Sequence, residues 1–315
     1  MEYRMTEAER GMTVKHYLHH VLRLSGAQVT ALKKDPLGIL VNGAHVTVRC
    51  VLQPDDVLAL ADTDTDSSEN IVPTEMPLQI LYEDDAIIVC NKPPYMPTHP
   101  SHGHYTDTLA NGLAALFVRR GQPFVFRSCS RLDRDTSGVV TIAKTRAAAY
   151  HFQRAHVAGE VGKEYLAVLV GHLTPTEGEI GGCIKRMENS VITRIVTEDD
   201  GAPALTRYRV LAYGKAPDGR DLTLCAAQPI TGRTHQLRVH FAHLGTPMLG
   251  DFLYGEEHDA LIGRQALHCR KTTFDHPTSG RRMTLTAALP DDFLSLMNCF
   301  DLDEGTVNTN DENHA

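Results

Sequence analysis

The amino-acid sequence predicts an α+β protein, in which a small α+β domain precedes a large mixed, mainly antiparallel sheet. Two observations support this prediction. From Leu78 to about Phe293, many short β-prone runs alternate with only a few helical patterns, which is typical of α+β folds. The first 60 residues instead pair two helical patterns with small strands. A chain of 315 residues has room for about two domains.

Residues 1–61 are expected to form the small domain, which begins with two helices. Apolar side chains recur at helical spacing over 14–22, and Ser25 can cap a second helix that runs to Lys33 and Lys34. A proline and a glycine shortly after this helix stop it. The two lysines are candidate RNA contacts, and solvated lysines on a generic module are the alternative.

Small strands follow the helices in the same domain. The turn pair Asn42-Gly43 separates the β-prone runs 39–41 and 44–48. Asn-Gly between such runs is a strong signal for a hairpin. Residues 57–60 supply a further strand. The first part of the chain is therefore expected to be a compact module.

The rest of the chain is expected to divide into a linker at 62–76, a large domain at 77–297 and a disordered tail at 298–315. The linker begins with a run of Asp, Ser and Thr, and the tail is acidic. Both compositions are typical of segments outside a packed core. A calcium loop is the alternative for the linker, but the run lacks the glycine and the terminal glutamate of such loops.

Within the large domain, the sequence patterns predict both strands and helices. Runs of β-prone residues predict strands at 86–90, 138–143, 165–170, 207–212 and 222–227. Capped or helical-period patterns predict helices at 106–120, 146–157 and 234–244.

The composition excludes several classes of protein. No apolar run approaches the roughly 18 residues that cross a bilayer. The charged N-terminus also lacks the apolar stretch of a secretory signal. Seven dispersed cysteines without a C-x-x-C pair argue for reduced thiols and against a structural zinc site. A cytoplasmic protein that does not bind a membrane is therefore expected.

The net charge of -8 conceals an uneven distribution of charge. Residues 61–85 carry eight acidic side chains and residues 300–315 carry five, and neither segment contains Lys or Arg. These thirteen leave 26 acidic against 31 basic side chains in the rest of the chain. A basic surface outside the two acidic segments is therefore compatible with RNA binding.

The segment from Ser130 to Gly138 carries the sharpest chemical signal. Asp133 lies between Arg131 and Arg134, and nearby positive charge favours an ionised carboxylate. The Thr-Ser-Gly turn that follows can bring backbone amides close to a ligand. An ionised carboxylate in a basic loop can serve as a nucleophile or as a base. A surface ion-pair cluster is the alternative.

This segment resembles the R-L-D-x-x-T-S-G signature of the RluA family of pseudouridine synthases, in particular its RluD-like members. Further segments match the motifs of that family in the same order. The motif before it matches Asn91-Lys92-Pro93-Pro94 with Thr98-His99-Pro100, and the next one after it matches Gly162 to Val170. Then follow Thr231 to His240 with Gly250-Asp251 and Tyr254-Gly255, and finally Leu267-His268 with His276-Pro277. The resemblance covers roughly residues 78–293. The first 60 residues resemble the alpha-L RNA-binding motif, and the residues that carry this likeness are Gly11, Lys33, Lys34, Val41, Asn42 and Gly43.

The resemblance implies the pseudouridine synthase fold and an isomerase that converts uridine to pseudouridine without a cofactor or metal. Asp133 matches the catalytic aspartate of the family, Tyr165 its active-site tyrosine, and Arg238 the arginine that pairs with the aspartate. The family reaction cuts the bond between N1 of uracil and the ribose, rotates the base and rejoins it through C5. The aspartate acts as nucleophile or as base, and both roles stay open here. A core tyrosine and a phosphate-binding arginine are the alternatives at 165 and 238.

Several basic side chains are expected to contact the RNA. The resemblance implies that Arg131 helps to fill the space that the target uridine leaves when it is extruded from its stack. The other expected contacts are Arg134, Lys92, Lys163, Arg233 and His235, together with Lys33 and Lys34. The family usually has a histidine before Arg-Leu-Asp, where this chain has Ser130. A serine can donate one hydrogen bond but cannot stack or carry charge.

Alternatives remain open at this point. A non-catalytic RNA-binding protein can keep the same fold, although plain binding does not need an acid–arginine pair. A zinc deaminase would need H-x-E and P-C-x-x-C elements, which this sequence lacks. The histidines of 16–20 and 99–104 lack the partners of a typical zinc site, so no metal is expected. The expected substrate is structured RNA, with large-subunit ribosomal RNA favoured over transfer RNA, and the expected state is a monomer.

Overall fold

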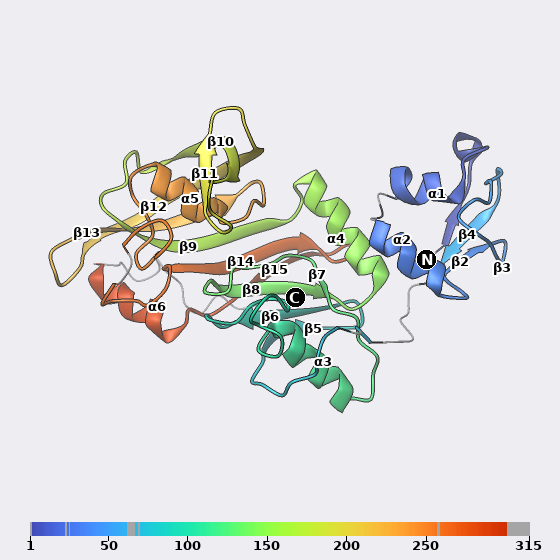
Figure 1. Cartoon of the computed structure of the whole chain (residues 1–315), viewed down its shortest axis with the longest axis horizontal. Coiled ribbons are helices and arrows are strands. Elements are labelled where there is room, and N and C mark those ends of the chain that lie inside the picture. The colour runs from blue at the N-terminus through green and yellow to red at the C-terminus, as the bar shows by residue number, and fades with distance from the viewer. Residues whose placement is uncertain are drawn as a thin grey trace.

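The structure is a computed structural model with a long sheet, a few helices around it, and a smaller N-terminal unit at one end (Figure 1). It describes residues 2–22, 24, 26–61, 67–68, 70–256 and 259–300. The expected cap Ser25, part of the expected linker and most of the expected tail lie outside these residues. The boundaries expected for the domains therefore stay predictions in those places.

The smaller unit is built on a four-stranded antiparallel sheet in the order β1-β4-β2-β3. Its strands are β1 (Glu2–Arg4), β2 (Ile39–Val41), β3 (Ala44–His45) and β4 (Val57–Leu60). Its helical segments are η1 (Glu7–Glu9), α1 (Val14–His16), the π-helical turn η2 (Tyr17–Val21) and α2 (Gly26–Lys34). The predicted hairpin is confirmed, because Asn42 and Gly43 have φ angles of 53° and 80°, as a two-residue type I′ turn requires.

The large sheet has 11 strands in the order β11-β10-β12-β13-β9-β14-β8-β6-β5, with β15 beside β14 and β7 beside β8. Only the pairing of β8 with β14 is parallel, and the other strand pairs of this sheet are antiparallel. The large mixed, mainly antiparallel sheet predicted from the sequence is therefore confirmed.

The strands of the large sheet are β5 (Gln79–Glu83), β6 (Ile87–Lys92), β7 (Arg127–Ser128), β8 (Ser137–Ala143), β9 (Gly162–Val170), β10 (Glu177–Arg186), β11 (Arg194–Thr197), β12 (Ala202–Lys215), β13 (Asp221–Pro229), β14 (Leu267–Asp275) and β15 (Arg282–Thr286). The helices around it are α3 (Leu109–Arg119), α4 (Arg146–Ala158), α5 (Gln236–His243), α6 (Asp291–Leu296) and the short η3 (Met297–Cys299). Among the described residues, none of the helices has both the length and the apolar character that crossing a membrane requires.

Some elements differ from the sequence prediction for identifiable reasons. Helix α5 begins two residues later than predicted, because His235 has a φ of 58° in the left-handed region. The sequence patterns do not predict β10, which contains three glycines and therefore has a low strand propensity. They also miss β14, where the polar run Arg270 to Thr273 interrupts the apolar signal.

Strand β8 is buried along its whole length and lies between β14 and β6. Its first residues form the parallel pairs with β14, in which Gly138 lies opposite Cys269. Gly138 has a φ of 116°, and a Cβ at this position would lie 2.1 Å from the carbonyl oxygen of Cys269. Glycine meets both conditions because it has no Cβ. This close contact fixes the start of β8 and the loop before it, which carries Asp133.

Helix α4 contacts both units of the molecule (Figure 1). Phe152 packs against Phe274 of β14 with ring centroids 5.0 Å apart, whereas Tyr150 is buried in the core cluster of the smaller unit. Arg146 donates hydrogen bonds to the carbonyl oxygen of Ala61 at 3.3 Å and to the carboxylate of Asp35 at 3.4 Å. One helix therefore packs into the large domain on one side and into the small unit on the other.

Packed structure continues past residue 297, where the tail was expected to begin. Phe300 is buried in a core cluster with Phe293 and Leu296, and it forms an isolated β-bridge with Gly214. The expected boundary at 297 is therefore corrected to at least residue 300. Residues 301–315, on which the rest of this expectation falls, lie outside the described residues.

Replacing Gly138 by alanine is expected to destabilise the protein strongly. The new Cβ would meet backbone rather than a flexible side chain, and its φ of 116° is unfavourable for alanine. Strain and overpacking together are expected to lower the free energy of unfolding by about 3 kcal/mol or more, measured by urea denaturation. Gly181→Ala is the control, because a Cβ there would have nothing within 4 Å. Equal stability of Gly138→Ala and the control would contradict this account.

Candidate active site

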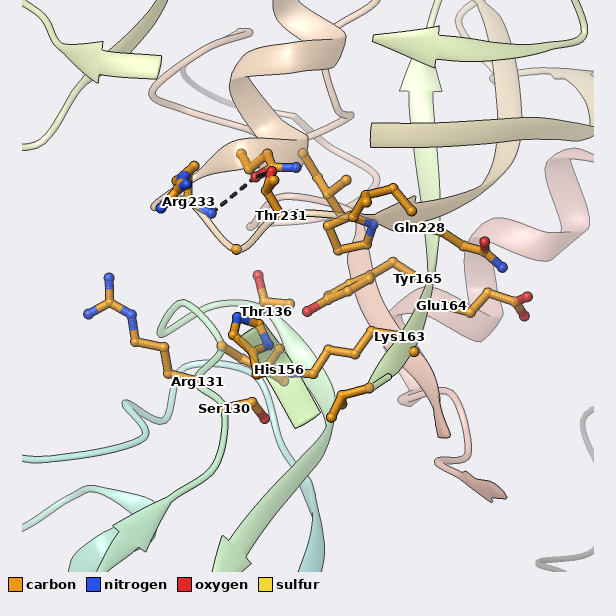
Figure 2. Close-up of a pocket in the computed structure, with 18 of the residues that line it drawn as sticks. Ser130, Arg131, Thr136, His156, Lys163, Glu164, Tyr165, Gln228, Thr231 and Arg233 are labelled. Atoms are coloured by element: carbon orange, nitrogen blue, oxygen red, sulfur yellow. Dashed lines mark hydrogen bonds between the residues drawn. The ribbon is translucent and has the colours of Figure 1, made fainter. Parts of the chain in front are cut away.

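A cavity of about 420 Å³ lies where the loop before β8, the start of β9, the segment before α5 and strand β14 meet. Its lining includes Asp133, Tyr165 and Arg238, the three residues predicted to be catalytic. These residues come from three separate sequence motifs, and the fold brings them to one pocket. Figure 2 shows Tyr165 and Lys163 extending from β9 toward the loop that carries Ser130 and Thr136.

The Asp133 carboxylate lies beside a buried guanidinium. Arg238 Nη1 is 3.4 Å from Asp133 Oδ2, and the side chain of Arg238 is 4% exposed. The other two nitrogens of Arg238 bind Asp251 in a bidentate pair, in which both N···O distances are 2.7 Å. The acid–arginine pair expected from the sequence is therefore present, and Asp251 forms its third member.

Asp251 was not assigned a role from the sequence, although it lies within a matched motif. Its carboxylate is fully buried and also accepts hydrogen bonds from the backbone N–H groups of Leu253 and Tyr254. The guanidinium and these two N–H groups together satisfy both carboxylate oxygens. Asp251 therefore neutralises Arg238 and holds its guanidinium in the orientation that reaches Asp133.

His235 also lies beside the Asp133 carboxylate, next to the same oxygen that Arg238 contacts. Its Nε2 is 3.9 Å from Asp133 Oδ2, and its Nδ1 is 3.0 Å from the hydroxyl of Tyr254. That hydroxyl also accepts the backbone N–H of Arg194 at 2.9 Å. Burial lowers the pKa of His235 and outweighs the opposing effect of Asp133. A neutral imidazole with a fixed ring orientation therefore faces the carboxylate at neutral pH.

The loop that carries Asp133 is held by side chains from distant segments. Lys92 is fully buried, and its ammonium donates to the carbonyl oxygens of Pro93, Met96 and Arg134 at 2.9, 2.7 and 2.9 Å. Burial lowers the pKa of Lys92 to about 7. Lys92 therefore cannot contact RNA in this structure, which corrects the sequence prediction, because its three donors are used inside the protein.

Two further side chains complete this support. Arg264 is fully buried, pairs with Asp292 at 2.7 and 2.9 Å, and donates to the carbonyl oxygen of Asp135 at 2.9 Å. The hydroxyl of Thr98 donates to the carbonyl oxygen of Leu132 at 3.1 Å. Carbonyl groups on both sides of Asp133 are thus fixed by buried donors. Nothing in the charge pattern singled out Arg264.

Tyr165 and Lys163 project into the pocket from the same face of β9. Burial raises the pKa of the Tyr165 hydroxyl well above its ordinary value, and the negative charge of Asp133 adds to this rise. Tyr165 therefore keeps its proton and can act as a hydrogen-bond donor. Burial lowers the pKa of Lys163, and the pocket lining offers its ammonium no carboxylate partner at ion-pair distance among the described residues.

The other predicted RNA contacts fall into two groups. Exposed Arg131 and Arg233 lie at the pocket, where Arg131 donates to the hydroxyl of Thr234 at 2.9 Å. Arg134 points elsewhere and pairs with Asp135, with N···O distances of 2.7 and 3.0 Å. Lys33 and Lys34 are exposed at the end of α2 in the smaller unit. Only some of the predicted RNA-contacting side chains therefore lie at the pocket.

Ser130 lines the pocket with a buried hydroxyl that has no hydrogen-bond partner among the described residues. His156 of α4 and Lys163 of β9 line the same pocket (Figure 2). No cluster of three or more His, Cys, Asp or Glu suited to a metal ion occurs among the residues described. The pocket lining offers carboxylate, phenol, imidazole and basic side chains.

The comparison with known protein families agrees with this site. Residues 86–243 match the model of a family described as RNA pseudouridylate synthase. The chain belongs to the RNA pseudouridylate synthase family. The matched range includes Asp133, Tyr165 and Arg238, whereas Asp251 and Arg264 lie beyond its end. As a member of this family, the protein is an RNA pseudouridine synthase, an isomerase that acts on RNA.

Relatives of this RNA pseudouridine synthase cover most of the chain. It is 39% identical over 286 residues to the uncharacterised RNA pseudouridine synthase YjbO of Bacillus subtilis (strain 168), with 91% of this chain and 98% of the relative covered. It is 34% identical over 259 residues to the ribosomal large subunit pseudouridine synthase D of Yersinia pestis, with 78% of each covered. Among solved structures, human RNA pseudouridylate synthase domain containing 1 is 32% identical with a TM-score of 0.58, covering 71% of this chain and 88% of that chain.

Replacing Asp251 by asparagine is expected to disturb the active site of this pseudouridine synthase. The change keeps the volume but leaves the buried Arg238 without its bidentate partner. Breaking a buried pair from one side lowers the free energy of unfolding by about 3 kcal/mol or more, measured by urea denaturation. Asp221→Asn is the control, because its partner Lys215 is 70% exposed and such pairs contribute about 1 kcal/mol or less. A loss no larger than that of the control would overturn the role given to Asp251.

Proposed function

We propose that this protein converts specific uridines of large-subunit ribosomal RNA to pseudouridine, with Asp133 as the catalytic carboxylate. The observation that carries the proposal is the contact of 3.4 Å between Asp133 and the buried Arg238 at the wall of a nucleotide-sized pocket. The name of the Yersinia pestis relative supports the choice of ribosomal RNA. The basic end of α2 supports binding of a folded RNA.

The reaction conserves all atoms of the nucleotide. The bond between N1 of uracil and C1′ of the ribose breaks, the freed base turns within the pocket, and C5 bonds to C1′. The proton on C5 is lost and N1 becomes an N–H group, so neither an oxidant nor a reductant is needed. The protein has to hold the base, supply a charged group at the sugar and handle one proton.

The Asp133 carboxylate shares its arginine with Asp251. Arg238 brings one positive charge between two carboxylates, and its shorter, bidentate contacts go to Asp251. Of the two carboxylates, the partly exposed Asp133 is therefore the one that lines the pocket. A carboxylate of this kind can attack C1′ as a nucleophile or accept a proton from the sugar as a base.

Tyr165 and Arg131 are proposed to act on the target nucleotide itself. The Tyr165 ring can stack on uracil, and its protonated hydroxyl can donate a hydrogen bond to the base. Arg131 is exposed at the pocket entrance, where a side chain can fill the space left by an extruded uridine. Lys163, Arg233 and His235 line the same pocket and are proposed to contact the flanking RNA.

Replacing Asp133 by asparagine is expected to reduce turnover by on the order of 10³-fold or more while RNA affinity stays close to wild type. The amide keeps the shape of the side chain but cannot act as nucleophile or base. Turnover is measured as tritium release from large-subunit ribosomal RNA labelled at C5 of uracil. Asp107→Asn, at an exposed carboxylate paired with His104, is the control and should keep full activity. Full activity of Asp133→Asn would refute the site assignment.

The same assay tests the substrate. Unmodified transcripts of large-subunit ribosomal RNA and of transfer RNA are compared under identical conditions with wild-type protein. Tritium release from ribosomal RNA alone supports the proposal. Release from transfer RNA alone would keep the reaction and reject the proposed substrate.

Lys163 is expected to limit activity at alkaline pH. Burial lowers its pKa, so its contact with RNA is present below this pKa and is lost as the pH rises through it. Lys163→Arg should shift the alkaline limb of kcat/KM upward by about one pH unit or more, because the pKa of arginine is far higher. The two proteins are compared on the same RNA, so that effects of pH on the RNA cancel. An unchanged limb would exclude a charged role for Lys163.

A further inference from the structure

Helix α4 spans the distance between the small unit and the active-site pocket. Its 13 residues carry two arginines and two histidines but no acidic side chain. A helix of this length is about 20 Å long. Arg146 and Tyr150 attach its first half to the small unit, and His156 lines the pocket at its other end. Figure 1 shows α4 beside the smaller unit, and Figure 2 shows His156 among the residues that line the pocket.

Exposed basic side chains lie where α4 meets the small unit. Lys33 and Lys34 are both exposed, and they directly precede Asp35, whose carboxylate pairs with Arg146 of α4 at 3.4 Å. This pairing neutralises the acidic side chain of the α2 end. The chain carries no Asp or Glu from Arg10 to Lys34, so the helices of the small unit add no negative charge here.

Further basic side chains follow along α4 toward the pocket. Arg154 lies one helical turn after Tyr150, is exposed, and stands over the Tyr150 ring with its guanidinium carbon 5.8 Å from the ring centroid. His156 follows at the pocket. Its Nε2 is 3.5 Å from the position that a Cβ of Gly232 would take, which places the imidazole beside the segment that carries Arg233.

We propose that Lys33, Lys34, Arg154, His156 and Arg233, called here the basic strip, form one continuous surface that binds an RNA double helix flanking the target uridine. The inference rests on the proposed function and adds the shape of the RNA that the site selects. Phosphates along a duplex match a row of exposed basic side chains, and such contacts set register without reading sequence.

Helix α4 also fixes the spacing along this surface. Because the helix packs into the small unit through Tyr150 and against β14 through Phe152, the two ends of the basic strip cannot move independently without breaking buried contacts. A duplex held at Lys33 and Lys34 is therefore presented at a constant distance from Asp133. The favoured substrate is a uridine at the end of a stem, with about 20 Å of duplex beside it.

The test compares two triple variants that remove the same amount of charge. The strip variant is Lys33→Gln, Lys34→Gln and Arg154→Gln. The control variant is Arg207→Gln, Arg209→Gln and Lys215→Gln, which removes three exposed basic side chains from β12, away from the pocket lining. The melting temperatures of both variants are first compared with that of the wild-type protein. Asp133 and its partners are unchanged in both variants.

The first measurement is the salt dependence of affinity for an RNA hairpin with a long duplex stem. The slope of log K against log salt should fall in the strip variant by an amount that corresponds to two or three lost phosphate contacts, at about 0.7 to 0.9 per contact. The control should keep the wild-type slope. Equal slopes in the two variants would overturn the proposal.

The second measurement is tritium release from intact ribosomal RNA and from the same RNA cut into short fragments. The strip variant should lose on the order of 10-fold to 100-fold in kcat/KM on intact RNA and keep the wild-type value on fragments. An equal loss on both would show that the strip does not select a duplex. Absence of tritium release with wild-type protein would reject the proposed substrate. The salt dependence of hairpin affinity would still show whether the basic strip binds duplex RNA.

Discussion

A guanidinium that is removed from water has to be neutralised by an acidic partner. Asp251 is the main partner of Arg238, and Asp133 makes the longer contact. The bidentate pair with Asp251 uses two nitrogens and leaves one to point at the loop before β8. Since both partners are almost without solvent exposure, the guanidinium has little freedom to move. The position of the Asp133 carboxylate is thus set from the far side of the pocket by a buried ion pair.

Backbone carbonyl groups supply the second half of this constraint. The carbonyl oxygens of Leu132, Arg134 and Asp135 each accept a hydrogen bond from a buried side chain. Two of the donors, Lys92 and Arg264, are basic side chains that serve the loop rather than the RNA. A basic residue in an RNA-modifying enzyme therefore need not touch nucleic acid, and exposure separates the two uses.

The sequence predicted the parts of the site that local chemistry reveals. Asp133 between two arginines is visible as a charge pattern, and its pairing with Arg238 was implied by the resemblance to the RluA family. The roles of Lys92, Asp251 and Arg264 depend on contacts between residues that are far apart in the chain, so no local pattern reveals them. The same limit applies to the fold. The Asn42-Gly43 hairpin is encoded within a few residues, whereas the glycine-rich β10 becomes a strand only because β11 and β12 pair with it.

The parallel contact between β8 and β14 is short, with Ser137 opposite His268 and Gly138 opposite Cys269. This contact, called here the seam, joins two parts of the sheet. One part contains β8, which follows the Asp133 loop, and the other contains β9, which carries Tyr165. Each side of the seam has its own antiparallel hydrogen bonds, and both sides contribute residues to one hydrophobic core cluster. Catalytic geometry likewise exists only across the seam. A fragment ending after β8 would hold the nucleophile or base without its arginine, and activity would return only when a complementary fragment restored the join.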